Sequence, residues 1–353
     1  MMKKACQFVE FRLKCHQMIW GDLVKVLVTG GAGYVGSCIC QALIKSGHVP
    51  IILDSLLSGR NCFVDNKNFY KADIGNLEVL AKIFDEHPDI EAMIHYAERA
   101  MVGNSVKNPY DYYISNVSKS IEVCNFITEA GCKKMIYCST GAIYEDVAGY
   151  MVSESSPIKP RSPFARSKYI TEMVLEDFCA AYDIRCIALR YFNPIGASPD
   201  MSAGPEASNS GNIVSKILEA VHNSTNFIIN GDDWATKDGT CIRDYLHVWD
   251  LAMAHVKAIE NFDRAFRISE SAGYLPINIG SGKGASVKEV ITAFENVSGD
   301  KVKVKIGPRR PGDTGGAYAS TNLARDCIEW RAELSMEEAI LDAIRWEDKR
   351  RGR

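Results

Sequence analysis

The fold of this 353-residue chain is decided by residues 23–48, LVKVLVTGGAGYVGSCICQALIKSGH. A mostly apolar run leads into Gly30, Gly33 and Gly36, and apolar residues then recur at helical spacing until Gly47. This order predicts a buried strand, a glycine turn and an amphipathic helix. Glycines are needed where the backbone turns sharply and approaches a pyrophosphate held at a helix N-terminus. The stretch therefore predicts a dinucleotide-binding turn.

A second apolar run, VPIIL, ends at Asp54. A carboxylate at this distance from the glycine turn accepts hydrogen bonds from the ribose hydroxyls of an adenosine and repels a 2′-phosphate. The sequence therefore favours NAD over NADP as the cofactor. Arg60 follows closely and weakens this preference, because a cation there would suit the 2′-phosphate.

Strand-like and helix-like segments continue to alternate as far as IRCIALRYF, residues 184–192, and they include an expected long helix over 114–130. Alternation of this kind predicts an α/β fold with a doubly wound parallel sheet of the Rossmann type. Cofactors bind such sheets at the carboxyl ends of the strands. The residues that fall at these ends are Asp73, Tyr96, Ala97, Glu98, Thr140, Tyr191, Phe192 and Asn193.

Composition narrows the class of protein. The net charge of −3 and the pI of about 6.2 give no electrostatic case for a nucleic acid or an anionic membrane as partner. No apolar run reaches the roughly 18 residues of a membrane span, and charges interrupt residues 1–22, so we expect a cytoplasmic protein with a peripheral N-terminal extension. The twelve cysteines form no CxxC pair, which favours free thiols over disulfides or a metal site.

With these motifs in place, the chain resembles the extended short-chain dehydrogenase/reductase family, and within it the UDP-glucose (UDP-galactose) 4-epimerases. The resemblance runs over about residues 24–347, and the motifs that carry it are TGGAGYVGS, KADI, VGNSVKNPYDYYISNV, CSTGAIY, ALRYFNPIGA, DGTCIRDYLHVWDLAMAH and RRPGD. It implies an NAD-binding Rossmann domain over 23–193 and 241–263, and a smaller α/β nucleotide-sugar domain over 194–240 and 264–347, before a basic tail at 348–353. It also implies a homodimer.

The resemblance assigns roles to individual residues. Those implied to bind NAD are Gly30, Gly33, Tyr34, Val35, Gly36, Asp54, Asp73, Ile74, Tyr96, Ala97, Asn116, Lys168 and Phe192. Those implied to bind the UDP-sugar are Thr140, Asn193, Asn212, Arg243, Arg310, Asp313 and Ala317. Arginine suits the diphosphate because its planar fork offers two donors at once. Arg243 and Arg310 are equally compatible with surface ion pairs when the family is left aside.

The catalytic motif departs from the family. In these enzymes a hydride leaves C4 of the sugar for NAD and returns to the other face, while a tyrosinate four residues before a lysine takes the 4-hydroxyl proton. The corresponding stretch is SPFARSK, residues 162–168, with Phe164 in the place of tyrosine and Lys168 retained. Phenylalanine cannot move a proton, so we expect impaired activity. A deliberate tyrosine-to-phenylalanine substitution and natural divergence both explain this residue.

Further departures surround the same expected crevice. Glu98 stands where a small residue is usual, Ala100 where lysine is common, Glu145 where glycine is usual, and Asn230 where an aromatic residue stacks on uracil. A carboxylate of Glu98 or Glu145 offers an alternative base, but we interpret both as solvated loop residues.

Other functions remain open. A 4,6-dehydratase would need an Asp-Glu pair where Gly141 and Ala142 stand, and a UDP-glucuronate decarboxylase is weakened by the same absence. A non-catalytic protein that binds NAD and a nucleotide-sugar is compatible with Phe164.

The sugar is addressed by RRPGDTGGAYAS, residues 309–320. Family members restricted to glucose and galactose carry a bulky tyrosine four residues after the aspartate, where this chain has Ala317. The smaller side chain predicts that 2-acetamido sugars fit, although a shift of one residue would bring Tyr318 into this place.

Overall fold

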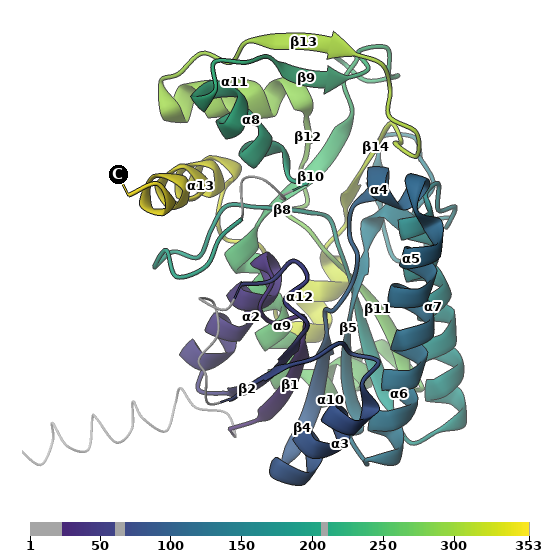
Figure 1. Cartoon of the computed structure of the whole chain (residues 1–353). Coiled ribbons are helices and arrows are strands. Elements are labelled where there is room, and N and C mark those ends of the chain that lie inside the picture. Colours follow the sequence, from purple (N-terminus) through teal and green to yellow (C-terminus); the bar gives the residue numbers. More distant parts are fainter. Residues whose placement is uncertain (1–22, 61–67, 206–210, 353) are drawn as a thin grey trace, which may run out of the picture.

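The computed structural model describes residues 23–60, 68–205 and 211–352, so the predicted extension at 1–22 lies outside the described residues. A seven-stranded sheet forms the larger lobe, with strand order β11-β7-β5-β4-β1-β2-β3 (Figure 1). All neighbouring strands are parallel. The strands are β1 Lys25–Thr29, β2 Val49–Asp54, β3 Phe69–Lys71, β4 Ile90–His95, β5 Lys134–Thr140, β7 Arg185–Tyr191 and β11 Tyr274–Ile279. The predicted doubly wound α/β fold is confirmed.

Helices cover both faces of this sheet (Figure 1). One face packs against α2 Tyr34–Lys45, α9 Val248–Glu260, α10 Phe262–Ser269 and α12 Asn322–Ile328. The other face packs against α3 Leu77–Glu86, α6 Lys119–Glu129 and α7 Pro163–Ala181. Strand β1 shows why its sequence is apolar almost throughout: Val26 and Val28 enter the first core and Leu27 enters the second.

The helix predicted over 114–130 is present, and it begins with a π-helical turn. Helix α4 Val102–Lys107 is followed by α5 Pro109–Tyr113, a π-helical turn at Ile114–Ser118, and then α6. A π-helical turn inserts extra backbone into a helix and often marks a functional position. Here the turn carries Asn116, which is buried.

The smaller lobe stands at the carboxyl end of the large sheet (Figure 1). Its strands are β6 Met151–Val152, β8 Asn193–Ile195, β10 Ile242–His247, β12 Gly284–Ser286 and β14 Gly316–Ala319, with a separate pair of β9 Phe227–Asn230 and β13 Val304–Gly307. Its helices are α8 Ile213–His222, α11 Val287–Ser298 and α13 Met336–Arg350. Residues from these elements share a third core.

Two parts of the predicted domain division differ from this arrangement. Residues 274–279 were expected in the smaller domain, but β11 pairs with β7 and α12 packs on the large sheet. Strand β10 was expected in the larger domain, yet it pairs with β8, β12 and β14. Hydrogen bonding between distant segments decides both assignments. The basic tail begins inside α13, where the Arg350 and Arg351 guanidinium groups pair with Glu347.

Within the described residues, no helix is both long and apolar enough to span a membrane. The nine cysteines of the same residues are free thiols, and most are buried in the two cores of the large lobe, as predicted.

Candidate active site

The glycine turn connects β1 to α2 and packs closely on the end of β4. Gly30 has a φ of +75°, and a Cβ added there would lie 2.8 Å from the Ala97 nitrogen. A Cβ at Gly36 would lie 2.1 Å from the Gly30 carbonyl oxygen. No side chain caps α2 at Gly33, and its first turn carries no acidic residue. A helix N-terminus with open N–H groups fits an anionic pyrophosphate.

Asp54 lies beside this turn at the end of β2. Its Oδ2 accepts a hydrogen bond from the Ala32 nitrogen at 3.0 Å, and its Oδ1 accepts one from Leu56 at 2.8 Å. Burial raises the pKa of Asp54, and these two hydrogen bonds oppose the rise. The Arg60 nitrogen donates to the Ala32 carbonyl at 2.9 Å, so Arg60 also borders the turn. The turn and its carboxylate therefore fit the adenosine half of NAD.

Tyr34 and Val35 begin α2. The Tyr34 hydroxyl donates to the Gly196 carbonyl at 2.6 Å, which ties the turn to the loop after β8. Val35 is buried in the core of the large lobe. Their backbone positions, rather than their side chains, therefore suit the predicted contact with the pyrophosphate.

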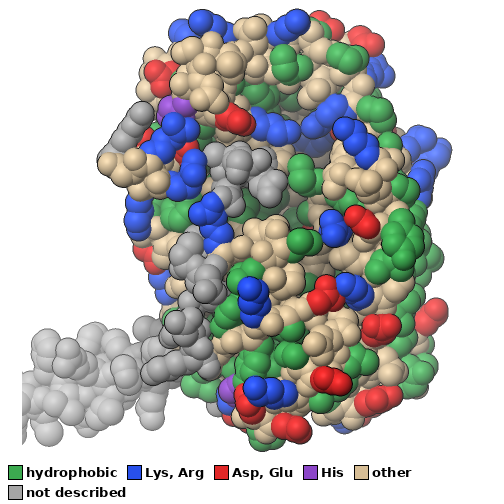
Figure 2. Space-filling model, in the orientation of Figure 1, with side chains coloured by type: hydrophobic (Ala, Val, Ile, Leu, Met, Phe, Trp, Pro, Cys, Tyr) green, Lys and Arg blue, Asp and Glu red, His purple; other side chains and the backbone are tan. Residues whose placement is uncertain are grey.

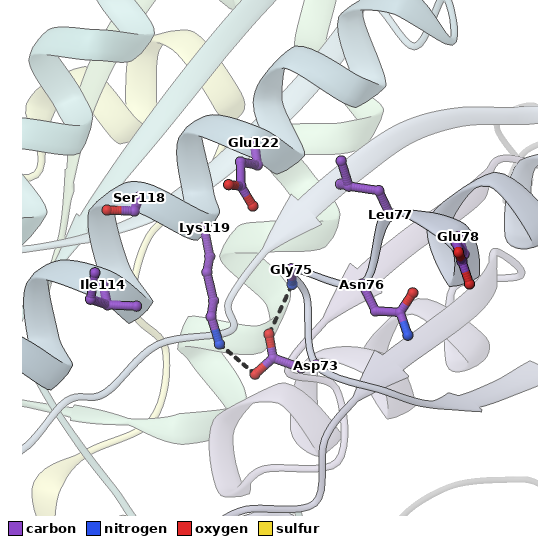
Figure 3. A pocket seen from close by; sticks show the side chains of 9 residues that line it. All are labelled: Asp73, Gly75, Asn76, Leu77, Glu78, Ile114, Ser118, Lys119 and Glu122. Carbon is purple, nitrogen blue, oxygen red and sulfur yellow. Dashed lines mark hydrogen bonds and ion pairs between the residues drawn. The ribbon is translucent and has the colours of Figure 1, made fainter.

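Asp73 lines an open depression of about 720 Å³ between the start of α3 and the start of α6 (Figure 3). Its Oδ1 accepts from the Gly75 nitrogen at 2.9 Å, and its Oδ2 pairs with the Lys119 ammonium at 2.7 Å. Ile74, next to it, is buried in the core. The pairing of the Asp73 carboxylate with Lys119 was not predicted. Because this pairing occupies the side chain of Asp73, the backbone of Asp73 and Ile74 is the part that suits an adenine edge.

Aromatic and hydroxyl side chains gather at the ends of β4, β5 and β7. The Tyr96 ring stacks on Tyr191, with centroids 6.1 Å apart. Thr140 is the residue opposite Tyr191 in the β5–β7 ladder, and its Oγ1 accepts from the Ala142 nitrogen at 3.2 Å. Phe192 packs against Gly141, where a Cβ would lie 2.6 Å from the Phe192 ring.

Phe164 and Lys168 lie one turn apart on α7. Ser162 caps this helix by accepting a hydrogen bond from the Ala165 nitrogen at 3.1 Å, and Pro163 occupies its first turn. Phe164 is only 6% exposed and Lys168 only 2%. The spacing places both side chains on one face of the helix. The helix therefore presents the lysine of the catalytic motif beside a ring that carries no hydroxyl.

Glu98 is not the solvated loop residue that we predicted. Its side chain is 3% exposed and forms an ion pair with the equally buried Lys168 ammonium, and its Oε1 accepts a hydrogen bond from the Tyr191 hydroxyl at 3.0 Å. Burial alone would lower the pKa of Lys168, but the charge of Glu98 holds it above its ordinary value. Since only folding brings β4 and α7 together, no local sequence signal could have revealed this contact.

Glu145, by contrast, is confirmed as a solvated loop residue. Its side chain is 32% exposed and pairs with the exposed Lys159 and Arg161.

Asn116 joins the loop after Glu98 to helix α7. Its Oδ1 accepts from the Arg99 nitrogen at 2.9 Å, and its Nδ2 donates to the Arg99 carbonyl at 3.0 Å and to Ser167 Oγ at 3.1 Å. The Ser167 hydroxyl in turn donates to the Phe164 carbonyl at 2.7 Å. The structure thus gives Asn116 a role in positioning this loop, which the sequence did not indicate.

Asn212 and Arg243, both predicted to bind the UDP-sugar, belong to the smaller lobe. Asn212 caps α8 through Oδ1, which accepts from the Ser215 nitrogen at 2.9 Å, whereas its buried Nδ2 has no hydrogen-bond partner among the described residues. Arg243 donates to the carbonyls of Ile242 and Thr314 at 2.8 and 3.1 Å. A buried donor without a partner is costly, and a ligand oxygen would satisfy it.

Cationic side chains gather nearby. Arg310 pairs with Asp313, with 3.0 Å between Nε and Oδ2, and burial followed by the charge of Arg310 lowers the pKa of Lys216. Figure 2 shows a hollow between the lobes, with Lys and Arg side chains along its upper edge. Asn193 is exposed at the start of β8. These charges fit a diphosphate.

Ala317 and Tyr318 point to opposite faces of β14, since side chains alternate along a strand. Ala317 packs against the same small apolar cluster as Phe192. The Tyr318 ring lies over Gly284, where a Cβ would be 2.7 Å from a ring carbon. Ala317, and not Tyr318, therefore packs on the apolar cluster that Phe192 also contacts.

Known proteins resemble this chain in sequence and structure. A sequence profile of the NAD dependent epimerase/dehydratase family matches residues 26–273. UDP-glucose 4-epimerase 4 of Oryza sativa subsp. japonica is 36% identical over 338 residues, covering 92% of this chain and 90% of the rice protein.

Among solved structures, UDP-glucose-4-epimerase of Stenotrophomonas maltophila, with bound NAD and formylated UDP-arabinopyranose, matches with a TM-score of 0.86 and 33% identity, covering 94% of this chain and all of the other. The UDP-Glc/GlcNAc 4-epimerase of Campylobacter jejuni matches with a TM-score of 0.76 and 31% identity, over 92% of this chain and 99% of its own.

Proposed function

This chain belongs to the NAD dependent epimerase/dehydratase family, and on that premise we propose that it inverts C4 of a UDP-hexose, at a rate limited by Phe164. The observation that carries the proposal is the arrangement of Phe164 and Lys168 on one face of α7, beside the ends of β4, β5 and β7. The glycine turn and Asp54 supply the adjoining NAD site.

Each part of the crevice has one task in this proposal. NAD, when bound, supplies the acceptor and donor of hydride at C4. The glycine turn and Asp54 hold its pyrophosphate and adenosine ribose, and Lys168 holds the nicotinamide ribose. The Thr140 hydroxyl hydrogen-bonds the reacting oxygen of the sugar. Asn212, Arg243 and Arg310 bind the UDP diphosphate. The Nδ2 of Asn212, which has no hydrogen-bond partner among the described residues, is available to donate to it.

Removal of the 4-hydroxyl proton is the step that this site is expected to perform slowly. A phenol at position 164 would accept this proton, but the ring of Phe164 offers no acceptor, and this is the reason for expecting slow turnover. The surroundings of Phe164 support an otherwise intact site. Ser162 caps α7, the Ser167 hydroxyl donates to the Phe164 carbonyl, and the Lys168 ammonium pairs with Glu98.

The sugar pocket favours N-acetyl substrates in addition to UDP-glucose and UDP-galactose. The methyl group of Ala317 packs beside the same cluster as Phe192, and Tyr318 occupies the opposite face of β14. Because alanine is much smaller than tyrosine, we expect room beside the sugar for a 2-acetamido group. The Campylobacter jejuni neighbour, whose name includes GlcNAc, supports this breadth.

A homodimer through α6 and α7 completes the proposal. Tyr110, Ile114 and Met173 expose large apolar side chains on α5, on the π-helical turn that leads directly into α6, and on α7, and α5, this turn and α7 lie side by side (Figure 1). Light scattering coupled to size-exclusion chromatography should give twice the chain mass, and Met173→Glu should shift the protein toward the monomer. A native chain that elutes only as a monomer at micromolar concentration would contradict the dimer.

A non-catalytic NAD and nucleotide-sugar binding protein is the second candidate. Phe164 favours it, and so does the pairing of Lys168 with Glu98. A dehydratase is disfavoured, since a side chain at position 141 would collide with the Phe192 ring.

Calorimetry with NAD, followed by titration with UDP-glucose and UDP-galactose, tests the proposed function. We expect about one NAD and one UDP-sugar per chain, with conversion between the two sugars over long incubation. Binding of both ligands without any conversion, even after Phe164→Tyr, would favour the non-catalytic candidate. No binding of either ligand would overturn both.

A further inference from the structure

The buried pair of Glu98 and Lys168 occupies the end of the site where Lys168 is needed for the nicotinamide ribose. We propose that Glu98 competes with NAD for the Lys168 ammonium and thereby sets how weakly this chain holds its cofactor. This inference rests on the proposed function, specifically on the role of Lys168 toward the ribose. It makes Glu98 a positioning residue that acts on the cofactor through Lys168.

The backbone places Glu98 between the two halves of the cofactor site. On one side, the Ala97 nitrogen donates to Thr29 Oγ1 at 3.3 Å and touches the position of a Cβ on Gly30. On the other side, the Glu98 carboxylate reaches Lys168 on α7. The segment Ala97–Glu98 therefore runs from the pyrophosphate turn to the lysine, along the path that a dinucleotide has to follow.

The position of the Glu98 carboxylate is fixed by its neighbours. The two hydrogen bonds between Asn116 and the Arg99 backbone hold the loop, and Asn116 is itself tied to Ser167 on α7. The Tyr191 hydroxyl holds Oε1 at 3.0 Å. A carboxylate held from three elements does not leave the ammonium without cost.

Charge and donor count explain the competition. An ammonium has three donors, and in this site it faces the Glu98 carboxylate while its Nζ lies 4.2 Å from the centre of the Tyr137 ring. Two sides of Lys168 are thus occupied before the ribose arrives. In a buried site the ion pair is strong, and a second negative charge close to a pyrophosphate is unfavourable. NAD has to share or displace Glu98, which reduces its affinity.

The dissociation constants of NAD, by calorimetry, and of NADH, by its fluorescence, test this inference in four proteins. They are the native chain, Glu98→Gln, Glu98→Gly and Glu145→Gln. We expect both Glu98 variants to bind NAD and NADH about tenfold more tightly or better, a gain of roughly 1.4 kcal/mol. Glu145→Gln is the matched control, because it removes an exposed carboxylate paired outside the crevice, and it should leave both constants unchanged.

The thermal stability of the cofactor-free proteins separates competition from a structural role. Removing Glu98 leaves the buried Lys168 without its counter-charge, so the midpoint of unfolding should fall while the cofactor binds more tightly. A purely structural role would lower stability and affinity together. In a Lys168→Met background, where the ammonium is absent, Glu98→Gln should no longer tighten binding by way of the lysine. The double variant removes both members of the buried ion pair, so it leaves neither charge without its partner.

Each outcome has one meaning. Unchanged or weaker binding in folded Glu98→Gln and Glu98→Gly proteins overturns the inference and leaves the proposed function intact. An equal gain with and without Lys168 also overturns it, since Glu98 would then act on the cofactor directly. Absence of NAD binding in all proteins would overturn the proposed function itself.

Discussion

Phe164→Tyr restores the one atom that the catalytic motif lacks. Position 164 lies in the first turn of α7, whose cap at Ser162 and lysine at 168 are in place, so the added hydroxyl projects on the same helical face as the Lys168 side chain. General base catalysis contributes roughly a hundredfold to ten-thousandfold to a rate. The turnover of UDP-galactose should therefore rise by at least about two orders of magnitude, with little change in UDP-sugar affinity.

The Glu98–Lys168 pair decides where in this range the gain falls. A tyrosinate needs a nearby positive charge to lower the pKa of its phenol, and Glu98 offsets the charge of Lys168. Each unit by which the phenol pKa stays high represents about 1.4 kcal/mol. We therefore expect a gain of about a hundredfold for Phe164→Tyr alone, and about a further tenfold when Glu98→Gly is added.

The assay follows the conversion of UDP-galactose to UDP-glucose by proton NMR at saturating NAD. Phe178→Tyr is the matched control, because it adds a hydroxyl to the same helix away from the site and should not alter turnover. The reasoning is refuted if Phe164→Tyr stays within about threefold of the native rate. A native chain that already turns over at roughly 10 per second, a common enzyme rate, would refute it as well, and the Glu98 carboxylate would then be the base to examine.

Three further changes test other parts of the structure. Ala317→Tyr should weaken the binding of UDP-N-acetylglucosamine about tenfold or more and spare UDP-glucose, as measured by calorimetry; equal effects on both sugars would contradict the pocket assignment. Glu172→Ala removes the partner of the buried Arg190 and should lower the free energy of unfolding in urea by about 3–5 kcal/mol; a loss below about 1 kcal/mol would show that water replaces the pair. Burial, followed by the charge of Lys168, lowers the pKa of His95 to about 3, so the stabilising contribution of the neutral ring is present above a pH of about 6.5 and is lost as the pH falls toward 3. His95→Gln should therefore reduce the pH dependence of the free energy of unfolding by about 1.4 kcal/mol per pH unit across this window. An unchanged slope would show that His95 is not buried as a neutral ring.

Local patterns were enough to predict the NAD half of the fold. The glycine turn, the α2 helix and Asp54 follow one another within a short stretch, and each depends on its own residue types. These elements are readable because backbone geometry and apolar spacing determine them locally.

Contacts between distant segments could not be predicted from local sequence patterns. The burial of Glu98 depends on Lys168, which reaches it only after β4 and α7 have packed together. The π-helical turn at Asn116 depends on bonds to Arg99 and Ser167 that no helical pattern shows. The choice between Ala317 and Tyr318 required the face that each side chain takes in β14.

The most direct test of C4 epimerisation uses UDP-galactose that carries deuterium at C4. The native and Phe164→Tyr proteins, loaded with NAD, are incubated with it in ordinary water, and the products are analysed by NMR and mass spectrometry. We expect UDP-glucose with the deuterium still at C4, formed slowly by the native chain and much faster by the variant. Failure of the variant to form UDP-glucose, or loss of the deuterium to water, would contradict hydride return within this site.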